Sequence, residues 1–493
     1  MPGPWTAADV TAAGTRPGIY INFQEAAAAA IIAGTRGTVG IISESDWGTP
    51  NAIVELTNID DAVAAFTATE SATARLHNLC RLAFLGGART IKAARVMNTS
   101  GALKSTLNLN DTDGGGGTDV IQLDALYEGI FGDNIGVIIG DDPVDSTKTR
   151  IQVFVEGALV HTVISTVNHG SAGFVDDIIA LFLALNSVWV TATKLVDGAN
   201  DLANLASETA LASGNNGAAV TATQVDTVLA LFTTNAVNLI TIDSVVAAIH
   251  TSVQNWAEAR RAEGYYVMAV LGSDTGDAST VIITDSQAFN SEAVVYVGGG
   301  AVMPNTAVTS TIYNGATIAA MVAGIIAGAV IGRSATFFGL STSTAVETSF
   351  TNAQIVSMLA AGVLVISAAP AGTNPGARIE RGLTTLFNPG TGDIASFKLI
   401  RTVRIVDAIG EALTVGINAS VVGIQLNDAV GQETVIGMVK DFLDIQAASR
   451  NILPTFTVVV DTGGDSSGPN LFLNIGITPI DAIEMIFTTV TLN

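Results

Sequence analysis

The last forty residues, Pro454–Asn493, restrict the fold most strongly because they contain three strand-like segments and the last one ends with the chain. Apolar side chains alternate with others in 456–460 and 471–477, and a Gly- and Asp-containing turn separates the two runs. Pro479 opens the final run, IDAIEMIFTTVTLN. A terminal strand has unpaired N–H and C=O groups that can pair with another chain. We therefore expect a self-assembling structural protein whose ends add strands to neighbouring subunits.

The composition agrees with extensive burial between subunits. The chain has 493 residues, of which 48% are hydrophobic and 13% charged, and its mean hydropathy is +0.48. These values exclude a disordered chain and leave few charges to cover a free surface. The formal net charge of −23 also argues against nucleic acid and anionic membranes as partners, because both require clustered Lys and Arg.

The alternation of strand-like and helix-like segments predicts a mixed α/β fold with several domains. Strands are expected at 37–43, 90–96, 237–242, 266–271 and 293–297, with helices between them. After Thr348, strands are expected at 363–368, 379–386 and 397–405, and helices at 407–415 and 427–449. The expected division is an N-terminal arm (1–24), an α/β domain (25–100 plus 218–344), an inserted β-rich outer domain (101–217), a C-terminal α/β domain (345–478) and a C-terminal arm (479–493).

Two sequence features bear on compartment and membrane. Cys80 is the single cysteine, so the chain has no internal disulfide, and the start MPGPWTAADV lacks a secretory signal, which together favour synthesis in a cytoplasm. The uncharged run 316–331 is shorter than the roughly 20 residues of a spanning helix. It predicts a buried helix packed through Gly324, Gly328 and Gly332, with a membrane span as the alternative.

The sequence contains no convincing catalytic, cofactor or metal motif. Asp461-Thr-Gly463 matches an aspartic protease triplet, but a second such triplet is missing. The four histidines have no zinc-binding spacing. Gly298–Gly300 follows a strand as a dinucleotide loop would, yet Met303-Pro304 follows where a helix should begin. A tight turn is the preferred interpretation, and an α/β nucleotide-binding enzyme using this turn is the alternative.

Several segments, in this order, resemble contractile tail sheath proteins of bacteriophages and the related sheaths of R-type bacteriocins and contractile injection systems. They are RPGIYINF (Arg16–Phe23), RGTVGI (Arg36–Ile41), WGTP (Trp47–Pro50), LYEG with GDNIGV (Leu126–Gly129 and Gly132–Val137) and GARIERGLTT (Gly376–Thr385). The resemblance implies a non-enzymatic subunit that stacks in helical rings around an inner tube and contracts without a nucleotide. It implies no cofactor.

The resemblance also implies which residues join subunits. Strands from both termini would complete a sheet in another subunit, through Gly18, Ile19, Tyr20, Ile21, Phe23, Ile480, Ile483, Met485, Phe487, Val490 and Leu492. A helix at Asn427–Ser449 would face the tube, with Asp428, Glu433, Lys440, Asp441 and Asp444 as candidate contacts. An ordinary solvated helix face is the alternative for that helix.

The implied partners are other copies of the chain, the inner tube protein, and the baseplate and tail terminator proteins, with no nucleic acid and no direct membrane insertion. The implied location is a virion tail or a phage-derived contractile particle, made in the host cytoplasm. The joints at 14–18 and 476–479 are rich in Gly or Pro and would allow the arms to change direction.

Overall fold

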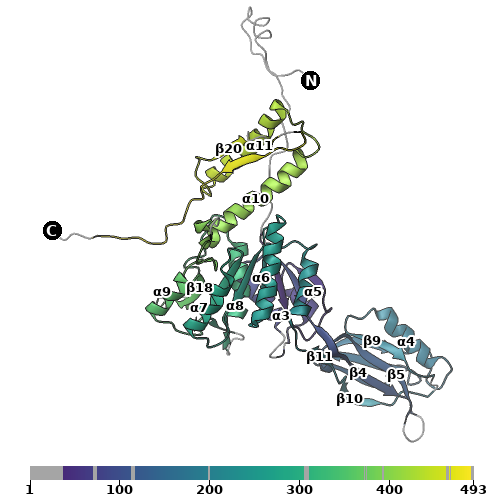
Figure 1. Ribbon diagram of the computed structural model, residues 1–493. Coiled ribbons are helices and arrows are strands. Elements are labelled where there is room, and N and C mark those ends of the chain that lie inside the picture. Colours follow the sequence, from purple (N-terminus) through teal and green to yellow (C-terminus); the bar gives the residue numbers. More distant parts are fainter. Residues whose placement is uncertain are drawn as a thin grey trace, which may run out of the picture. The chain divides into compact units, whose positions relative to one another are not determined.

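A computed structural model describes residues 37–69, 71, 75–112, 117–197, 200–304, 310–370, 372, 375–390, 394–461, 466 and 468–489 (Figure 1). These residues form two compact units. The larger unit contains the described residues up to Arg404 together with 482–489, and the smaller one contains 405–481.

The larger unit is built on an eight-stranded sheet with the order β19-β18-β14-β13-β12-β1-β3-β2. The inner strands are parallel, and the outermost strands β2 and β19 are antiparallel to their neighbours. The strands are β1 (Thr38–Ser43), β2 (Ile53–Leu56), β3 (Thr90–Arg95), β12 (Leu239–Ile242), β13 (Met268–Gly272), β14 (Val294–Gly298), β18 (Val363–Ala368) and β19 (Ala377–Ile379).

Helices cover both faces of this sheet (Figure 1). Val270 and Val295 point to one face, and Leu271 and Tyr296 point to the other. The first face is covered by α2 (Ile59–Phe66), α3 (Leu76–Gly86) and α8 (Gly315–Gly328), the second by α5 (Ala222–Phe232), α6 (Ala247–Ala262), α7 (Ser279–Phe289) and α9 (Asn352–Ala360). Burial on both sides explains why β12, β13 and β14 are almost continuously apolar. The predicted mixed α/β fold is confirmed.

Helix α8 is the apolar run that had a membrane span as its alternative interpretation. Its residues from Gly315 to Ala327 are all buried. A Cβ at Gly324 would lie 2.1 Å from the carbonyl oxygen of Ala83 in α3, so glycine is required for this close approach. None of the described helices is both long and apolar enough to cross a bilayer. The buried-helix prediction is therefore confirmed for α8, but the helix ends at Gly328 and the predicted packing position Gly332 lies in the turn that follows.

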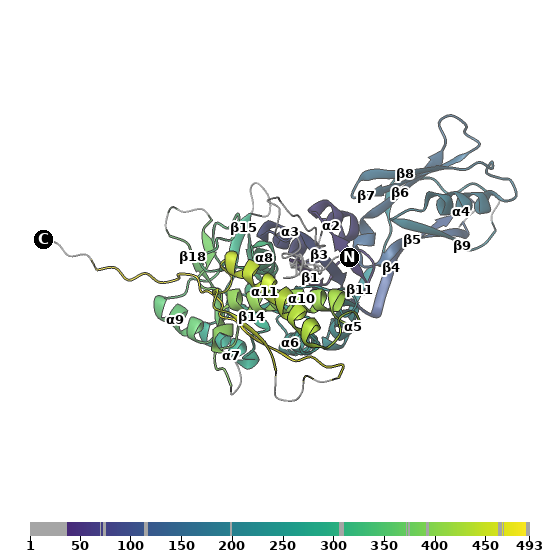
Figure 2. The same ribbon diagram turned by 90° about the horizontal axis from the view of Figure 1, so that it is seen from above.

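An inserted domain leaves the sheet after β3 and contains two antiparallel four-stranded sheets (Figure 2). One has the order β10-β6-β7-β8 and the other β11-β4-β5-β9. The elements are β4 (Asn98–Asn110), β5 (Asp119–Glu128), η1 (Ile130–Asn134), β6 (Ile135–Asp141), β7 (Thr149–Val155), β8 (Ala158–Ile164), α4 (Phe174–Leu185), β9 (Val190–Lys194), β10 (Leu205–Ala210) and β11 (Asn215–Ala218). The β-rich prediction agrees with this composition of elements.

A buried cation and an aromatic cluster fix the base of the inserted domain. Arg95 donates to the carbonyl oxygens of Gly48 at 2.6 Å and Glu128 at 2.8 Å. Burial lowers the pKa of Arg95 to about 10, so the guanidinium remains charged at neutral pH. The Trp47 ring lies edge-on to Tyr127, with 5.2 Å between centroids. Two of the recognisable sequence segments, WGTP and LYEG, are therefore packing motifs.

The smaller unit contains α10 from Ile405 onward, α11 and a two-stranded sheet, and its start differs from the expected domain boundary. The helix α10 spans Ile400–Ser420 and α11 spans Ala429–Ala448, while β20 (Thr457–Val460) pairs with β21 (Leu473–Gly476). The boundary expected near residue 345 is wrong, because β18 and β19 complete the main sheet. The strand expected at 397–405 is also wrong. It is η2 (Ala395–Lys398) followed by α10, in which Ile400 and Val403 are one helical turn apart and buried.

Candidate functional site

The hairpin β20–β21 has two outer edges that no other described strand covers. The N–H of Asp461 donates to the carbonyl oxygen of Phe472 at 2.9 Å, and hydrogen-bonded and non-hydrogen-bonded pairs alternate along antiparallel strands. The pairs that turn their backbone groups outward are therefore Val460 with Leu473 and Val458 with Ile475. Each edge offers main-chain groups to a further strand.

An apolar groove lies beside the β21 edge within the smaller unit. Its volume is about 540 Å³, and it is lined by side chains from the end of α10, the start of α11 and β21, including Val421, Leu426, Val435, Leu473 and Ile475. Leu426 is 76% exposed. A strand added at this edge would find an apolar surface for alternate side chains next to its hydrogen-bonding partners.

The C-terminal run is extended but forms no strand over the described residues 480–489. The N–H of Ile480 donates to the carbonyl oxygen of Asn451 at 3.0 Å, so this residue is tied to its own unit. Beyond it, Ile483 is 85% exposed and Phe487 is 92% exposed, and Met485 is exposed as well. The other candidate arm residues, Gly18, Ile19, Tyr20, Ile21, Phe23, Val490 and Leu492, lie outside the described residues.

Glu484 interrupts the apolar run and is held by the larger unit. Its carboxylate accepts hydrogen bonds from Arg381 Nε and from Thr336 Oγ1, both at 2.7 Å. The Glu484 side chain is 13% exposed. Sequence reasoning missed this anchor, although an acidic residue between apolar neighbours and the Arg381 of the GARIERGLTT segment were visible signals.

The candidate tube-facing residues do not form one group. Glu433, Lys440, Asp441 and Asp444 are exposed and lie along one side of α11, with the spacing of successive helical turns. Asp428 is the N-cap of α11, and its carboxylate accepts a hydrogen bond from the N–H of Gly431 at 2.8 Å. Asp428 therefore has a structural role that is independent of any partner.

The turn at Gly298–Gly300 connects β14 to β15 (Ala301–Pro304), which pairs antiparallel with β16 (Ser310–Tyr313) and β17 (Ala345–Val346). A Cβ at Gly300 would lie 1.9 Å from the carbonyl oxygen of Tyr313. The glycines thus allow close packing of the chain, and a strand follows where a phosphate-binding loop needs the N-terminus of a helix.

A cavity of about 830 Å³ opens at the carboxyl ends of β1 and β12. Glu44 and Asp243 line it together with Arg75, His77 and Arg81. Burial, and then the nearby carboxylate of Asp243, raise the pKa of Glu44, and burial raises the pKa of Asp243. The cavity therefore combines acidic and basic side chains.

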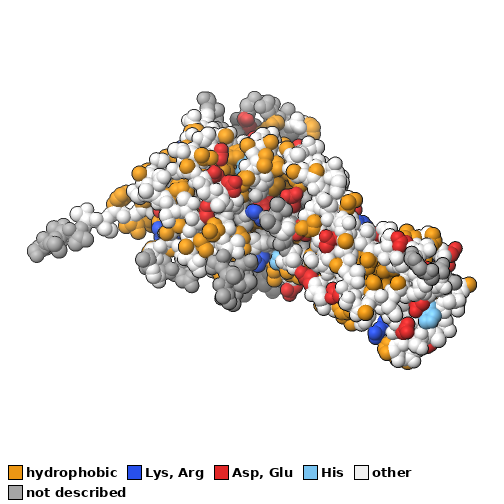
Figure 3. All heavy atoms as spheres, turned by 90° about the horizontal axis from the view of Figure 1, so that it is seen from below, with side chains coloured by type: hydrophobic (Ala, Val, Ile, Leu, Met, Phe, Trp, Pro, Cys, Tyr) orange, Lys and Arg blue, Asp and Glu red, His pale blue; other side chains and the backbone are white. Residues whose placement is uncertain are grey.

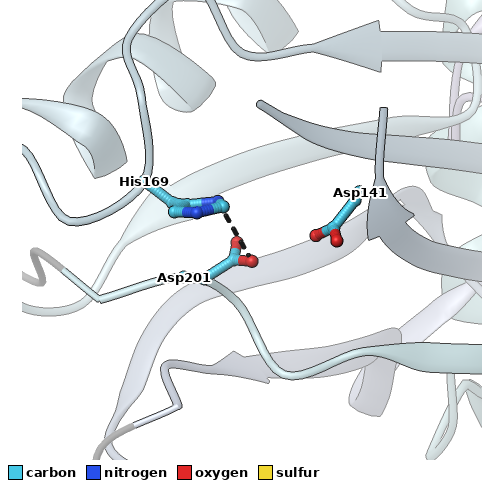
Figure 4. A group of neighbouring side chains, drawn as sticks. All are labelled: Asp141, His169 and Asp201. Carbon is cyan, nitrogen blue, oxygen red and sulfur yellow. Dashed lines mark ion pairs between the residues drawn. The ribbon is translucent and has the colours of Figure 1, made fainter. Parts of the chain in front are cut away.

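The inserted domain brings together one His and two Asp that the sequence spaces far apart. His169 Nδ1 lies 3.2 Å from Asp201 Oδ2, and Asp141 faces the same point (Figure 4). One ligand atom from each of the three residues lies within 4.8 Å of the others. The sequence shows no zinc-binding spacing around His169, because the fold alone brings these three residues together.

Comparison with known proteins identifies the central part of the chain. Residues 218–385 match the family described as phage tail sheath protein central domain. No curated protein is detectably similar in sequence. The sheath tail protein of Desulfitobacterium hafniense superimposes with a TM-score of 0.74 at 22% identity, over 95% of this chain and 98% of that one.

More distant sheath structures have the same fold. The sheath tail protein of Listeria innocua gives a TM-score of 0.64 at 20% identity, over 92% of this chain and 94% of its own. The contracted helical sheath of the anti-feeding prophage gives 0.57 at 12% identity, over 97% and 99%. Residues 218–385 therefore match the tail sheath central domain, and nearly the whole chain has the fold of the solved sheath proteins.

Proposed function

We propose that the chain is the structural subunit of a contractile sheath that polymerises helically around an inner tube and contracts to drive the tube through a target cell envelope. The observation that carries the proposal is the β20–β21 hairpin, whose outer edges are unpaired among the described residues, in a chain that also has an exposed apolar arm. The family is a structural one, which favours a non-enzymatic role.

Strand addition explains how these two features would work together. Residues Met485 and Phe487 project from an extended segment that lacks a partner strand in its own described chain. Paired with the hairpin of a neighbouring subunit, this segment would gain main-chain hydrogen bonds in a fixed register. A contact in which each subunit gives an arm and receives one is head-to-tail, and such contacts generate helical assemblies.

The surface of the larger unit is compatible with lateral packing. Hydrophobic and uncharged groups cover much of the face shown in Figure 3, with charged side chains scattered among them. Helical sheath and baseplate assemblies of the anti-feeding prophage are structural neighbours of this chain. We extend their assembly to it: copies of the chain pack in stacked rings, attached to a baseplate at one end and a terminator at the other.

The contact with the tube is assigned to the exposed side of α11. Glu433, Lys440, Asp441 and Asp444 are polar groups that can exchange partners with water at small cost, as a surface that slides during contraction requires. Contraction itself would release the free-energy difference between two packings of the same subunit, with no nucleotide consumed. The particle would be a virion tail or a related device assembled in the host cytoplasm.

Proline substitution at the hairpin edges tests the proposal. Ile475→Pro removes an outward N–H from β21, and Val460→Pro removes one from β20, while the bonds between the two strands remain. We expect at least one of these variants to be a folded monomer that forms no tubes by negative-stain microscopy. Ile475→Ala and Val460→Ala control for the lost side chains. Normal tubes from both proline variants would refute strand addition at this hairpin.

The enzyme alternative has its own test. A thermal shift assay with ATP, GTP and NAD should leave the unfolding temperature unchanged, since the Gly298 turn leads into a strand. A saturable increase with one nucleotide would reopen that alternative.

A further inference from the structure

We infer that Asp141, His169 and Asp201 form a binding site for a divalent transition-metal ion in the inserted domain (Figure 4). The three residues come from three connections: Asp141 ends β6, His169 lies between β8 and α4, and Asp201 lies between β9 and β10. The inference is independent of the proposed sheath function.

The distance between the two closest groups fits two ligands of one ion. Metal–nitrogen and metal–oxygen bonds of about 2.1 Å place neighbouring ligand atoms about 3.0 Å apart at a right angle and about 3.4 Å apart at a tetrahedral angle. His169 Nδ1 and Asp201 Oδ2 are 3.2 Å apart. The Asp141 carboxylate is within reach of the same point.

The His169 nitrogen is a second observation that points to a ligand. Nδ1 is shielded from solvent and has no hydrogen-bond partner among the described residues, despite its closeness to Asp201. A buried imidazole nitrogen without a hydrogen bond is costly, and a metal ion would use its lone pair.

Neighbouring groups hold the proposed ligands in place. The other carboxylate oxygen of Asp201, Oδ1, accepts from Thr149 Oγ1 at 2.5 Å and from the N–H of Leu202 at 2.8 Å, which leaves Oδ2 facing His169. The N–H of His169 donates to the carbonyl oxygen of Thr147 at 3.1 Å. Such supporting hydrogen bonds are typical of metal sites.

The ligand chemistry selects the class of ion. One imidazole and two carboxylates suit Zn²⁺, Mn²⁺ or Fe²⁺, whereas Mg²⁺ and Ca²⁺ prefer oxygen ligands alone. A bound ion would add a direct link between the end of β6 and the segments that carry His169 and Asp201.

Isothermal titration of the full-length, tag-free, chelator-treated protein with Zn²⁺ and with Mg²⁺ tests the inference. We expect one Zn²⁺ per subunit, an increase in unfolding temperature, and weaker binding of Mg²⁺. His169→Gln and Asp141→Asn should each weaken Zn²⁺ binding at least about tenfold. His161→Ala is the matched control, because His161 lies in the same domain and contacts Ser187 instead.

Absence of saturable Zn²⁺ binding would overturn the inference, as would equal binding by the wild type and the His169→Gln variant. If His169→Gln does not fold, Asp141→Asn decides, because Asp141 is exposed and its substitution should leave the fold intact.

Discussion

The main sheet and the β20–β21 hairpin differ in how fully their strands are paired and buried within one chain. The eight-stranded sheet has helices on both faces and antiparallel strands at its ends, and β12, β13 and β14 are buried throughout. The hairpin has two strands, and β21 alternates half-buried with exposed residues. A two-stranded sheet is marginally stable in water by itself, and this one is supported by the packing of β20 against α11.

This difference suggests that one region of the chain is stable after folding, whereas the other gains stability only on assembly. The strands of the main sheet are paired with one another and covered by helices of the same chain, so their stability should not depend on other subunits. The hairpin leaves hydrogen-bonding groups and an apolar groove available, so its stability should rise when another strand is added.

Removal of the exposed arm is expected to have the largest effect on assembly and almost none on folding. A chain truncated after Met485 keeps Glu484 and its contacts but loses Phe487, which is 92% exposed. We expect a monomer by sedimentation velocity, with the unfolding temperature of the wild-type monomer. Tubes formed by this variant would show that the arm is dispensable.

Truncation after Thr478 and deletion of residues 1–23 complete that test. Both should give folded monomers that do not polymerise. The first also removes the Glu484 anchor, so its unfolding temperature should be lower than that of the chain ending at Met485. An unfolded product would mean that the ends belong to the core.

Glycine-to-alanine substitutions should affect the stability of the two regions in opposite directions. Gly324→Ala should destabilise the main domain by about 3 kcal/mol, because its Cβ would lie 2.1 Å from the Ala83 carbonyl oxygen. Gly437→Ala in α11 meets no atom within 4 Å and should stabilise the helix by about 0.5–1 kcal/mol. Denaturant unfolding measures both, and similar losses in the two variants would contradict the contrast.

The N-cap of α11 should contribute less to the free energy of unfolding than the core does, but its contribution should be measurable. Asp428→Ala removes the hydrogen bond to the N–H of Gly431 and should cost about 1 kcal/mol. Glu433→Ala, on the exposed side of the same helix, should change stability by less than about 0.5 kcal/mol and serves as the control. Equal losses would remove the distinction between the cap and the proposed tube-facing side.

The smallest expected effect is a pH dependence in the main domain. The folded pKa of Asp243 is raised above its ordinary value of 3.8 by burial, so the folded state binds the proton more tightly. Stability should therefore fall as pH rises from about 3.8 through the raised pKa. Asp243→Asn should lack this fall, so its free energy of unfolding should exceed that of the wild type at pH 7. A variant that is destabilised by the same amount at pH 7 and below pH 3.8 would contradict the prediction.

Much of the fold follows from local patterns. The continuously apolar runs of β13 and β14 and the helices between them predict a parallel sheet, and the small residues of α8 predict close packing against another helix. These predictions succeed because a segment that is buried on both faces has an apolar or small residue at nearly every position. The order of short motifs also suffices to suggest the sheath family.

The sequence by itself determined the layered α/β class, the inserted β-rich segment and the apolar C-terminal run, because each depends on neighbours along the chain. The tertiary structure decided where the domains divide, that Ile400 begins a helix, that Arg381 holds Glu484, and that Asp141, His169 and Asp201 meet. Those features depend on contacts between residues distant in sequence. No local periodicity records such contacts, since they form when whole elements pack together.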